Sequence, residues 1–412
     1  MSPLFIILTV VLGVALLLLM VLKFRINAFI ALLITAIFVG IMAGMPPASV
    51  LKSIQDGMGS TLGFVATVVG LGAIFGQMLE ISGGAKSLSV YLLKKFGPGR
   101  STWALMLSGF LIGIPVFFDV GFIILIPVVY SLSRDSGKSV LLFGLPLLAG
   151  LAVTHSLVPP TPGPMAVAQI LKVNMGWVIL FGILVGLPMA IMGGIVFGRF
   201  ISSRLPNIRP PFIQELASED TDTGKKLPGF WTVAFLILLP LLLILTGTFV
   251  DLAVKKGSLA QSIFTDVLVF LGHPFSALII AALSSVLLCI RQKFPMATIL
   301  DMSNKALMPA GIIILVTGAG GVLKQVLVDS GIGKILAESI AGSDVSLVFL
   351  AWMLAAVVRI TQGSATVAMI TAAGIISPII SEMQISQPMI ALLVISIASG
   401  ATILSHVNDS GF

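Results

Sequence analysis

The sequence predicts an all-α polytopic membrane protein built from two inverted repeats, each with a re-entrant hairpin and a broken transmembrane helix. Three observations predict this fold class. Hydrophobic residues fill 58% of the 412 positions and charged residues only 9%, whereas a soluble protein carries about 25% charge. Apolar windows of roughly 20 residues, enough to span a bilayer, recur along the chain. One unusual segment also occurs twice.

The duplicated segment reads LGAIFGQMLEISGGAKSL at 71–88 and AGGVLKQVLVDSGIGKIL at 319–336. At one constant separation the copies share Gly72/Gly320, Gln77/Gln325, Leu79/Leu327, Ser82/Ser330, Gly83/Gly331, Lys86/Lys334 and Leu88/Leu336, and the match extends back to Pro47/Pro295 and Gly63/Gly311. Slightly further apart, Pro127 matches Pro378 and His155 matches His406. Duplication in so apolar a chain is typical of secondary transporters.

The repeats are expected at 1–201 and 229–412, joined by a polar cytoplasmic linker at 202–228. In the first repeat we expect spans at 3–22, 26–45, 61–81 and 175–198, a hairpin at 102–132 and a broken helix at 140–172. In the second we expect spans at 230–250, 267–290 and 309–328, a hairpin at 345–381 and a broken helix from 388. By analogy with the first repeat, the last span of the second repeat is expected to be missing, either because it has been lost or because the chain is shortened at its C-terminus.

Proline and glycine interrupt both hairpins, and lipid cannot satisfy the backbone groups that they free. We therefore expect the hairpin tips, 117–121 and 361–364, to meet the breaks at 154–163 and 405–411 around one cavity near the midplane. Lys and Arg collect on one side if the N-terminus lies outside, as the positive-inside rule requires, with Lys138, Arg199 and Arg204 among the cytoplasmic residues. In this topology the two repeats have opposite orientations.

Ionisable side chains at membrane depth are expensive unless paired or hydrated, so each one is a functional candidate. Asp119, in GIPVFFDVGF, is either a proton carrier or a polyol-binding group, or else it caps backbone amides at the tip. His155 lies in THSLVPPTPGP, and an imidazole suits proton coupling near neutral pH, although a neutral helix-end histidine is the alternative. The matching SHVNDSG break adds His406 and Asp409 as proton-coupling candidates.

The substrate-binding candidates are polar groups at the same interruptions. Arg359 suits a bidentate bond to a carboxylate, with a structural ion pair as the alternative. The other candidates are Asp119, Thr154, His155, Ser156, Thr161, Gly163, Gly363, Ser364, Thr366 and Asn408. Gly163 and Gly363 lie where helices restart, and a helix N-terminus attracts an anionic group. Serine and threonine hydroxyls in membrane helices otherwise bond to their own helix.

Other functional classes lack support in the residues. The chain has no phosphate-binding loop for ATP and no Cys/His metal spacing, so neither a cofactor nor a metal is expected. Basic residues lie singly or in pairs between spans, which argues against a nucleic-acid partner. A channel would need rings of similar groups, and an intramembrane hydrolase would need an oriented nucleophile; neither pattern is evident. Membrane lipid and a small anionic substrate are the expected partners.

Five blocks in order, GIPVFFDVGFIILIP, HSLVPPTPGP, GAGGVLKQVL, RITQGSATVA and HVNDSGF, resemble the gluconate permease family over essentially the whole chain. The family pattern frequently has histidine where this chain has Thr161. The resemblance implies proton symport of gluconate or a related sugar acid across the bacterial inner membrane, with D-serine as the alternative substrate. It also implies an elevator-type scaffold plus transport domain and a homodimer.

Overall fold

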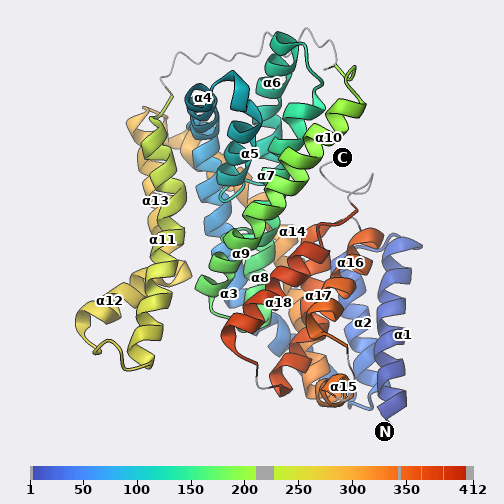
Figure 1. Ribbon diagram of the computed structural model, residues 1–412. Coiled ribbons are helices and arrows are strands. Elements are labelled where there is room, and N and C mark those ends of the chain that lie inside the picture. The colour runs from blue at the N-terminus through green and yellow to red at the C-terminus, as the bar shows by residue number, and fades with distance from the viewer. Residues whose placement is uncertain (1–2, 210–226, 342–344, 363, 384, 405–412) are drawn as a thin grey trace. The chain divides into compact units, whose positions relative to one another are not determined.

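The computed structural model describes residues 3–209, 227–341, 345–362, 364–383 and 385–404, and every regular element in these ranges is a helix (Figure 1). The first half contains α1 (Pro3–Leu22), α2 (Ala28–Met42), α3 (Pro47–Ile81), α4 (Gly84–Phe96), α5 (Ser101–Ile112), α6 (Phe118–Ser136), α7 (Leu141–Leu157), α8 (Pro162–Ile170), α9 (Met175–Ala190) and α10 (Phe197–Arg204). A 3-10 turn, Pro98–Arg100, precedes α5, and a π-helical turn, Ile191–Val196, joins α9 to α10.

The second half contains α11 (Phe230–Lys255), α12 (Ile263–Gly272), α13 (Pro274–Arg291), α14 (Met296–Asp329), α15 (Ile332–Ala341), α16 (Leu347–Gln362), α17 (Ala365–Glu382) and α18 (Gln387–Gly400). Within the described residues, seven stretches are long and apolar enough to cross a membrane: Pro47–Ile81, Leu141–Ile170, Met175–Arg204, Phe230–Lys255, Pro274–Arg291, Met296–Asp329 and Ala365–Glu382. The prediction of an all-α polytopic membrane protein is confirmed.

Two of these helices begin earlier than their apolar windows predicted. α3 starts at Pro47, not near 61, and α14 starts at Met296, not near 309. The added turns of α3 are amphipathic: Val50, Ser53 and Gly57 are buried, while Lys52 and Asp56 are exposed. Hydropathy alone left this polar segment out of the predicted span. A helix, however, needs only one buried face to be stabilised by packing.

The turn of the first hairpin lies slightly before the predicted tip. It covers 113–117, between α5 and α6, so Asp119 and Gly121 belong to the first turn of α6. Pro115 lacks the amide hydrogen that a continuing helix requires. The interruption therefore falls at Pro115, before Asp119 in the chain. α5 has 12 residues and α16 has 16, about 18 and 24 Å of helix, which is shorter than the roughly 30 Å hydrocarbon core.

The chain forms two compact units, and each takes helices from both halves of the sequence. Unit 1 comprises Met1–Gly70, Pro162–Phe181 and Met308–Phe412. Unit 2 comprises Leu71–Thr161 and Gly182–Leu307. The first hairpin, α5 and α6, therefore lies in unit 2 with α7 and α11–α13. The second hairpin, α16 and α17, lies in unit 1 with α1, α2, α8 and α18.

In unit 2, α5 packs against α7 through glycines that bring the two backbones together. A Cβ added to Gly109 would lie 2.5 Å from the Leu147 carbonyl oxygen, and one added to Gly150 would clash with the Met106 carbonyl oxygen. Small residues at helix interfaces give this close approach in membrane proteins. On the other side of unit 2, Met78, Cys289 and Ile299 form a buried cluster that joins α3, α13 and the start of α14.

Unit 1 contains the corresponding contact between α16 and α18. A Cβ added to Gly400 would clash with the Trp352 carbonyl oxygen, just as one at Gly150 clashes with that of Met106 in unit 2. The partners of the first helix of each half also correspond. α1 packs against α15 and α16 in unit 1, and α11 packs against α4 and α5 in unit 2. These equivalent contacts support the duplication read from the sequence, while its inverted geometry stays a prediction.

Candidate transport site

The first half of the candidate site is built at the tip of the first hairpin in unit 2. Gly76 on α3 allows the tip to approach closely, because a Cβ there would clash with the Pro115 carbonyl oxygen. α6 then begins after Phe117, which offers no side-chain cap, and Asp119 lies half-buried in its first turn. A carboxylate in this position is stabilised by the partial positive charge of the helix N-terminus.

The end of α7 lies against this tip. The His155 ring lies 6.0 Å from the Phe117 ring between centroids, with a tilt of 59° between the ring planes. His155 is half-buried, whereas its neighbours Thr154 and Ser156 are buried. The structure thus brings the tip and the first break together in unit 2, where His155 and Asp119 both lie.

The first break covers 158–161 and is held by local hydrogen bonds. The Val158 amide donates to the Thr154 carbonyl oxygen at 2.9 Å, and the Thr161 hydroxyl donates to the Val158 carbonyl oxygen at 2.7 Å. The Pro159–Pro160 peptide bond is cis. Since the Thr161 hydroxyl closes this turn, the residue has a structural task whatever its contact with a substrate.

The second half of the candidate site lies in unit 1, where α8 and α17 pack side by side in parallel. A Cβ added to Gly163, in the first turn of α8, would lie 2.5 Å from the Met369 methyl carbon on α17. At the other end of α8, the Ser377 hydroxyl of α17 donates to the Ile170 carbonyl oxygen at 2.9 Å. In both contacts the α17 residue follows its α8 partner by almost the same number of positions in the sequence, so the two helices are parallel and their N-termini lie at the same end. The N-terminus of α17 extends about one turn beyond that of α8.

Polar residues lie at the start of α17 and at the end of α16, which precedes it in the chain. Ser364 is the exposed N-cap of α17 and accepts a hydrogen bond from the Val367 amide at 3.4 Å. Thr366 is half-buried in the first turn. Arg359, in the last turn of α16, is 3% exposed and is the only charged side chain counted as buried among the described residues.

Several predicted residues are not part of this geometry. Gly363, His406, Asn408 and Asp409 lie outside the described residues, as does the whole predicted break at 405–411. The remaining candidates divide between the units: Asp119, Thr154, His155, Ser156 and Thr161 belong to unit 2, and Gly163, Arg359, Ser364 and Thr366 to unit 1. A single cavity shared by all of them stays a prediction.

Two residues at the site were missed by the sequence analysis. Phe117 was treated only as part of the tip, although its ring contacts His155. Thr371 is fully buried on α17, and its hydroxyl makes no hydrogen bond within the part of the chain that the structure describes. Its spacing of seven residues from Ser364 puts both on one helix face, a signal that the sequence did contain.

Comparison with known proteins connects this architecture to membrane transport. The model of the GntP family permease matches residues 5–412. The low-affinity gluconate transporter of Escherichia coli K12 is 40% identical over 100% of this chain and 91% of the relative. The gluconate permease of Pseudomonas aeruginosa is 40% identical over 96% of this chain and 87% of the relative. The Gnt-II system L-idonate transporter of Escherichia coli K12 is 37% identical, over 97% and 89% respectively.

Solved structures with the same fold are also transporters. The Neisseria gonorrhoeae MtrF structure, titled as illuminating a class of antimetabolite efflux pumps, matches with a TM-score of 0.63 over 85% of this chain and 73% of that chain. The Alcanivorax borkumensis YdaH transporter matches with a TM-score of 0.59 over 86% and 78%. Both are 17% identical and so define the fold alone. The protein is a multi-pass transporter and not an enzyme, and in bacteria its membrane is the inner membrane.

Proposed function

This chain belongs to the GntP permease family, and from that premise we propose that it imports gluconate or a related sugar acid by proton symport. The names of its relatives, gluconate and L-idonate transporters and permeases, support this substrate class. Both substrates are polyhydroxylated monocarboxylates. A site for them needs positive charge for the carboxylate and hydroxyl or carbonyl partners for the polyol chain.

The observation that carries the proposal is the parallel pair of α8 and α17 in unit 1. Two helix N-termini at one end supply positive dipole ends and amide donors, which favour anions. Pro162 and Pro164 lack amide hydrogens, so the first turn of α8 offers the Gly163 and Met165 amides. Arg359, one turn before the end of the preceding helix, adds the guanidinium that matches a carboxylate in bidentate geometry. In this proposal the substrate carboxylate is bound by unit 1, with Ser364, Thr366 and Gly163 around it.

Electrostatics explains why a proton accompanies the substrate. An anion entering a negative interior is opposed by roughly 2.3 kcal/mol per 100 mV. One co-transported proton cancels that charge, and a pH difference of one unit supplies about 1.4 kcal/mol more. We assign the proton to Asp119 or His155 in unit 2, with His406 and Asp409 of the second break as the other candidates. No cofactor and no metal enter this scheme.

The mechanical part of the proposal is an elevator in which two inverted repeats, 1–201 and 229–412, form a scaffold and a transport domain in each protomer of a homodimer. The equivalent contacts at Gly150 and Gly400 support a common origin of the halves. The shortness of α5 and α16 supports re-entrant hairpins. Mass photometry in nanodiscs tests the dimer, and accessibility labelling of both hairpin tips from each side of the membrane tests re-entry.

Uptake into proteoliposomes tests the transport proposal directly. Labelled gluconate should accumulate when the outside is acidic, and a protonophore should abolish this accumulation. Unlabelled L-idonate should compete more effectively than D-serine at equal concentration. Accumulation of D-serine without accumulation of gluconate would instead identify an amino-acid carrier, and gluconate accumulation that ignores the pH gradient would remove the proton from the mechanism.

A further inference from the structure

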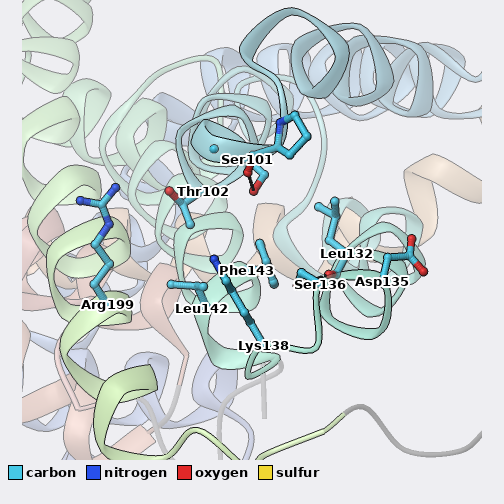
Figure 2. Close-up of a pocket in the computed structure, with 11 residues that line it drawn as sticks. Ser101, Thr102, Leu132, Asp135, Ser136, Lys138, Leu142, Phe143 and Arg199 are labelled. Carbon is cyan, nitrogen blue, oxygen red and sulfur yellow. Dashed lines mark hydrogen bonds between the residues drawn. The ribbon is translucent and has the colours of Figure 1, made fainter.

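A cavity of about 530 Å³ opens in unit 2 at the foot of the first hairpin, away from its tip (Figure 2). Its walls come from the start of α5, the end of α6, the α6–α7 connection, the start of α7 and α10. Polar side chains on these walls include Ser101, Thr102, Asp135, Lys138 and Arg199. None of these residues was assigned a task in transport, so the cavity is separate from the candidate transport site.

The charges around the cavity are arranged to favour an anion. Figure 2 shows Lys138 and Arg199, from two different elements, extending toward Thr102, while the Asp135 carboxylate points away from them. The Asp135 carboxylate accepts a hydrogen bond from the Ser131 hydroxyl at 3.1 Å, so its partner on α6 is Ser131. Two cations therefore approach the same region of the cavity wall, and the one acidic side chain is turned away from it.

The start of α5 adds hydrogen-bond donors on the same wall. α5 has 12 residues, and its N-cap, Arg100, makes no side-chain cap. The first-turn amides of such a helix have no intrahelical acceptor. Thr102 is only 7% exposed and lines the cavity, yet its hydroxyl makes no hydrogen bond within the described ranges. The neighbouring Ser101 hydroxyl is already used, since it donates to the Pro98 carbonyl oxygen at 3.1 Å.

The cavity lies at the polar end of a membrane span. Met175–Arg204 is a continuous helical stretch of 30 residues, and about 20 of them suffice to cross the hydrocarbon core. Arg199 is near the end of this stretch, between the exposed rings of Phe197 and Phe200. Lys138 and Arg199 both belong to the side that the positive-inside rule makes cytoplasmic. Basic pockets at this depth suit the headgroups of anionic lipids.

We propose that this cavity binds a phosphate group, supplied either by the headgroup of an anionic phospholipid or by a free phosphate ion. Lys138 and Arg199 provide the charge, and the Thr102 hydroxyl and the amides at the start of α5 provide hydrogen bonds to the phosphate oxygens. Because the cavity joins the ends of α5, α6 and α7, an occupied site stabilises the foot of the hairpin whose second helix, α6, carries Asp119 in its first turn.

The full-length chain in nanodiscs tests this proposal with two probes. One arm compares phosphatidylcholine nanodiscs with and without phosphatidylglycerol, and the other adds inorganic phosphate to pure phosphatidylcholine nanodiscs at constant ionic strength. The readouts are the midpoint of thermal unfolding and the lipids retained in native mass spectrometry. The test variants are Lys138→Gln, Arg199→Gln and Thr102→Val. Arg204→Gln is the control, because Arg204 lies on the same helix, 4.7 Å over the Phe200 ring, and does not line the cavity.

Removal of either cation should weaken binding of the active probe about fivefold, the effect of one basic residue near an anionic membrane surface. Thr102→Val should weaken it about threefold or more, while Arg204→Gln should leave it unchanged. A response to phosphatidylglycerol identifies the lipid as the source, and a response to inorganic phosphate identifies the free ion. The proposal is wrong if neither probe stabilises the protein, or if the three test variants respond as the control does.

Discussion

In both hairpins the first helix packs closely against another helix at a glycine, but the residues near the two tips differ in charge. In unit 2, α5 is held against α7 at Gly150, and in unit 1, α16 is held against α18 at Gly400, in each case by close contact with a backbone carbonyl. The first tip leads into a helix that carries Asp119, whereas the second is flanked by Arg359 and Ser364. The backbone contact is the same in both hairpins while the charge near their tips differs, so each hairpin can take a different part of the proposed symport.

If Asp119, in the first turn of α6, carries the proton, Asp119→Asn should reduce transport more than the other variants described below. Accumulation driven by a pH gradient should fall about 100-fold or more, the scale of a lost proton-transfer group. Counterflow exchange of gluconate should persist, because exchange needs no net proton release. Proteoliposome uptake and counterflow on the same preparation measure both quantities.

His155→Gln, tested in parallel, separates the two titratable groups of unit 2. Continued pH-dependent accumulation by both variants would exclude Asp119 and His155 as essential carriers. His406→Gln and Asp409→Asn would then decide whether the second break carries the proton.

If Arg359, in the last turn of α16, binds the substrate carboxylate, Arg359→Lys should raise the KM for gluconate about tenfold. A lysine keeps the positive charge but cannot form the bidentate hydrogen bonds of the guanidinium. Arg359→Gln should raise it further and should reduce the preference for gluconate over a neutral polyol of the same length. Initial uptake rates with and without the polyol measure both effects. An unchanged KM in Arg359→Lys, with normal thermal stability, would assign Arg359 to a structural ion pair.

Because Gly150 and Gly400 make equivalent contacts, substitutions at the two glycines should destabilise the protein to a similar extent. Gly150→Ala and Gly400→Ala should each destabilise the protein by about 1–3 kcal/mol, since the added Cβ meets a backbone carbonyl that cannot move aside freely. Gly63→Ala and Gly311→Ala are matched controls, because nothing lies within 4 Å of either added Cβ. These controls should be neutral or stabilising by up to about 1 kcal/mol. Thermal unfolding in detergent compares the four, and a large difference between Gly150→Ala and Gly400→Ala would break the equivalence.

The smallest expected effect comes from two equivalent helix caps. Asn27 begins α2 and accepts from the Phe29 amide at 2.9 Å, while His273 begins α13 and accepts from the Phe275 amide through Nδ1 at 3.3 Å. Burial lowers the pKa of His273 from its ordinary 6.5. The folded state therefore prefers the neutral ring, and stability should fall as pH drops from 6.5 toward the lowered pKa. His273→Asn should remove this dependence, worth a few tenths of a kcal/mol for so exposed a cap.

Unfolding midpoints at pH 7.5 and 5.5 measure the effect of the caps. Asn27→Asp introduces another capping residue into the equivalent position and serves as the comparison. Loss of stability at low pH that is identical in the parent and in His273→Asn would show that the His273 cap does not contribute to it.

Local sequence patterns predicted most of the helices and the interruptions near 113–117 and 158–161, because each is set by neighbouring residues. Pro115, Pro159 and Pro160 lack the amide hydrogen that a continuing helix requires, and they lie between helices, whereas Pro127 and Pro378 are held inside α6 and α17. The apolar windows exceed what a soluble helix requires. The polar starts of α3 and α14 were missed for the opposite reason. Their helical state depends on a buried face, and burial is decided by neighbours distant in sequence.

The sequence by itself determined that this is a duplicated, all-helical membrane protein with polar residues at matched interruptions. Only the tertiary structure decided which of those residues share a compact unit. α8 follows α7 in the chain, yet it packs beside α17, where Gly163 fits Met369 and Ser377 bonds to Ile170. That choice depends on backbone-to-side-chain fit between helices about 200 residues apart, and hydrophobic periodicity does not encode the shape of a distant partner.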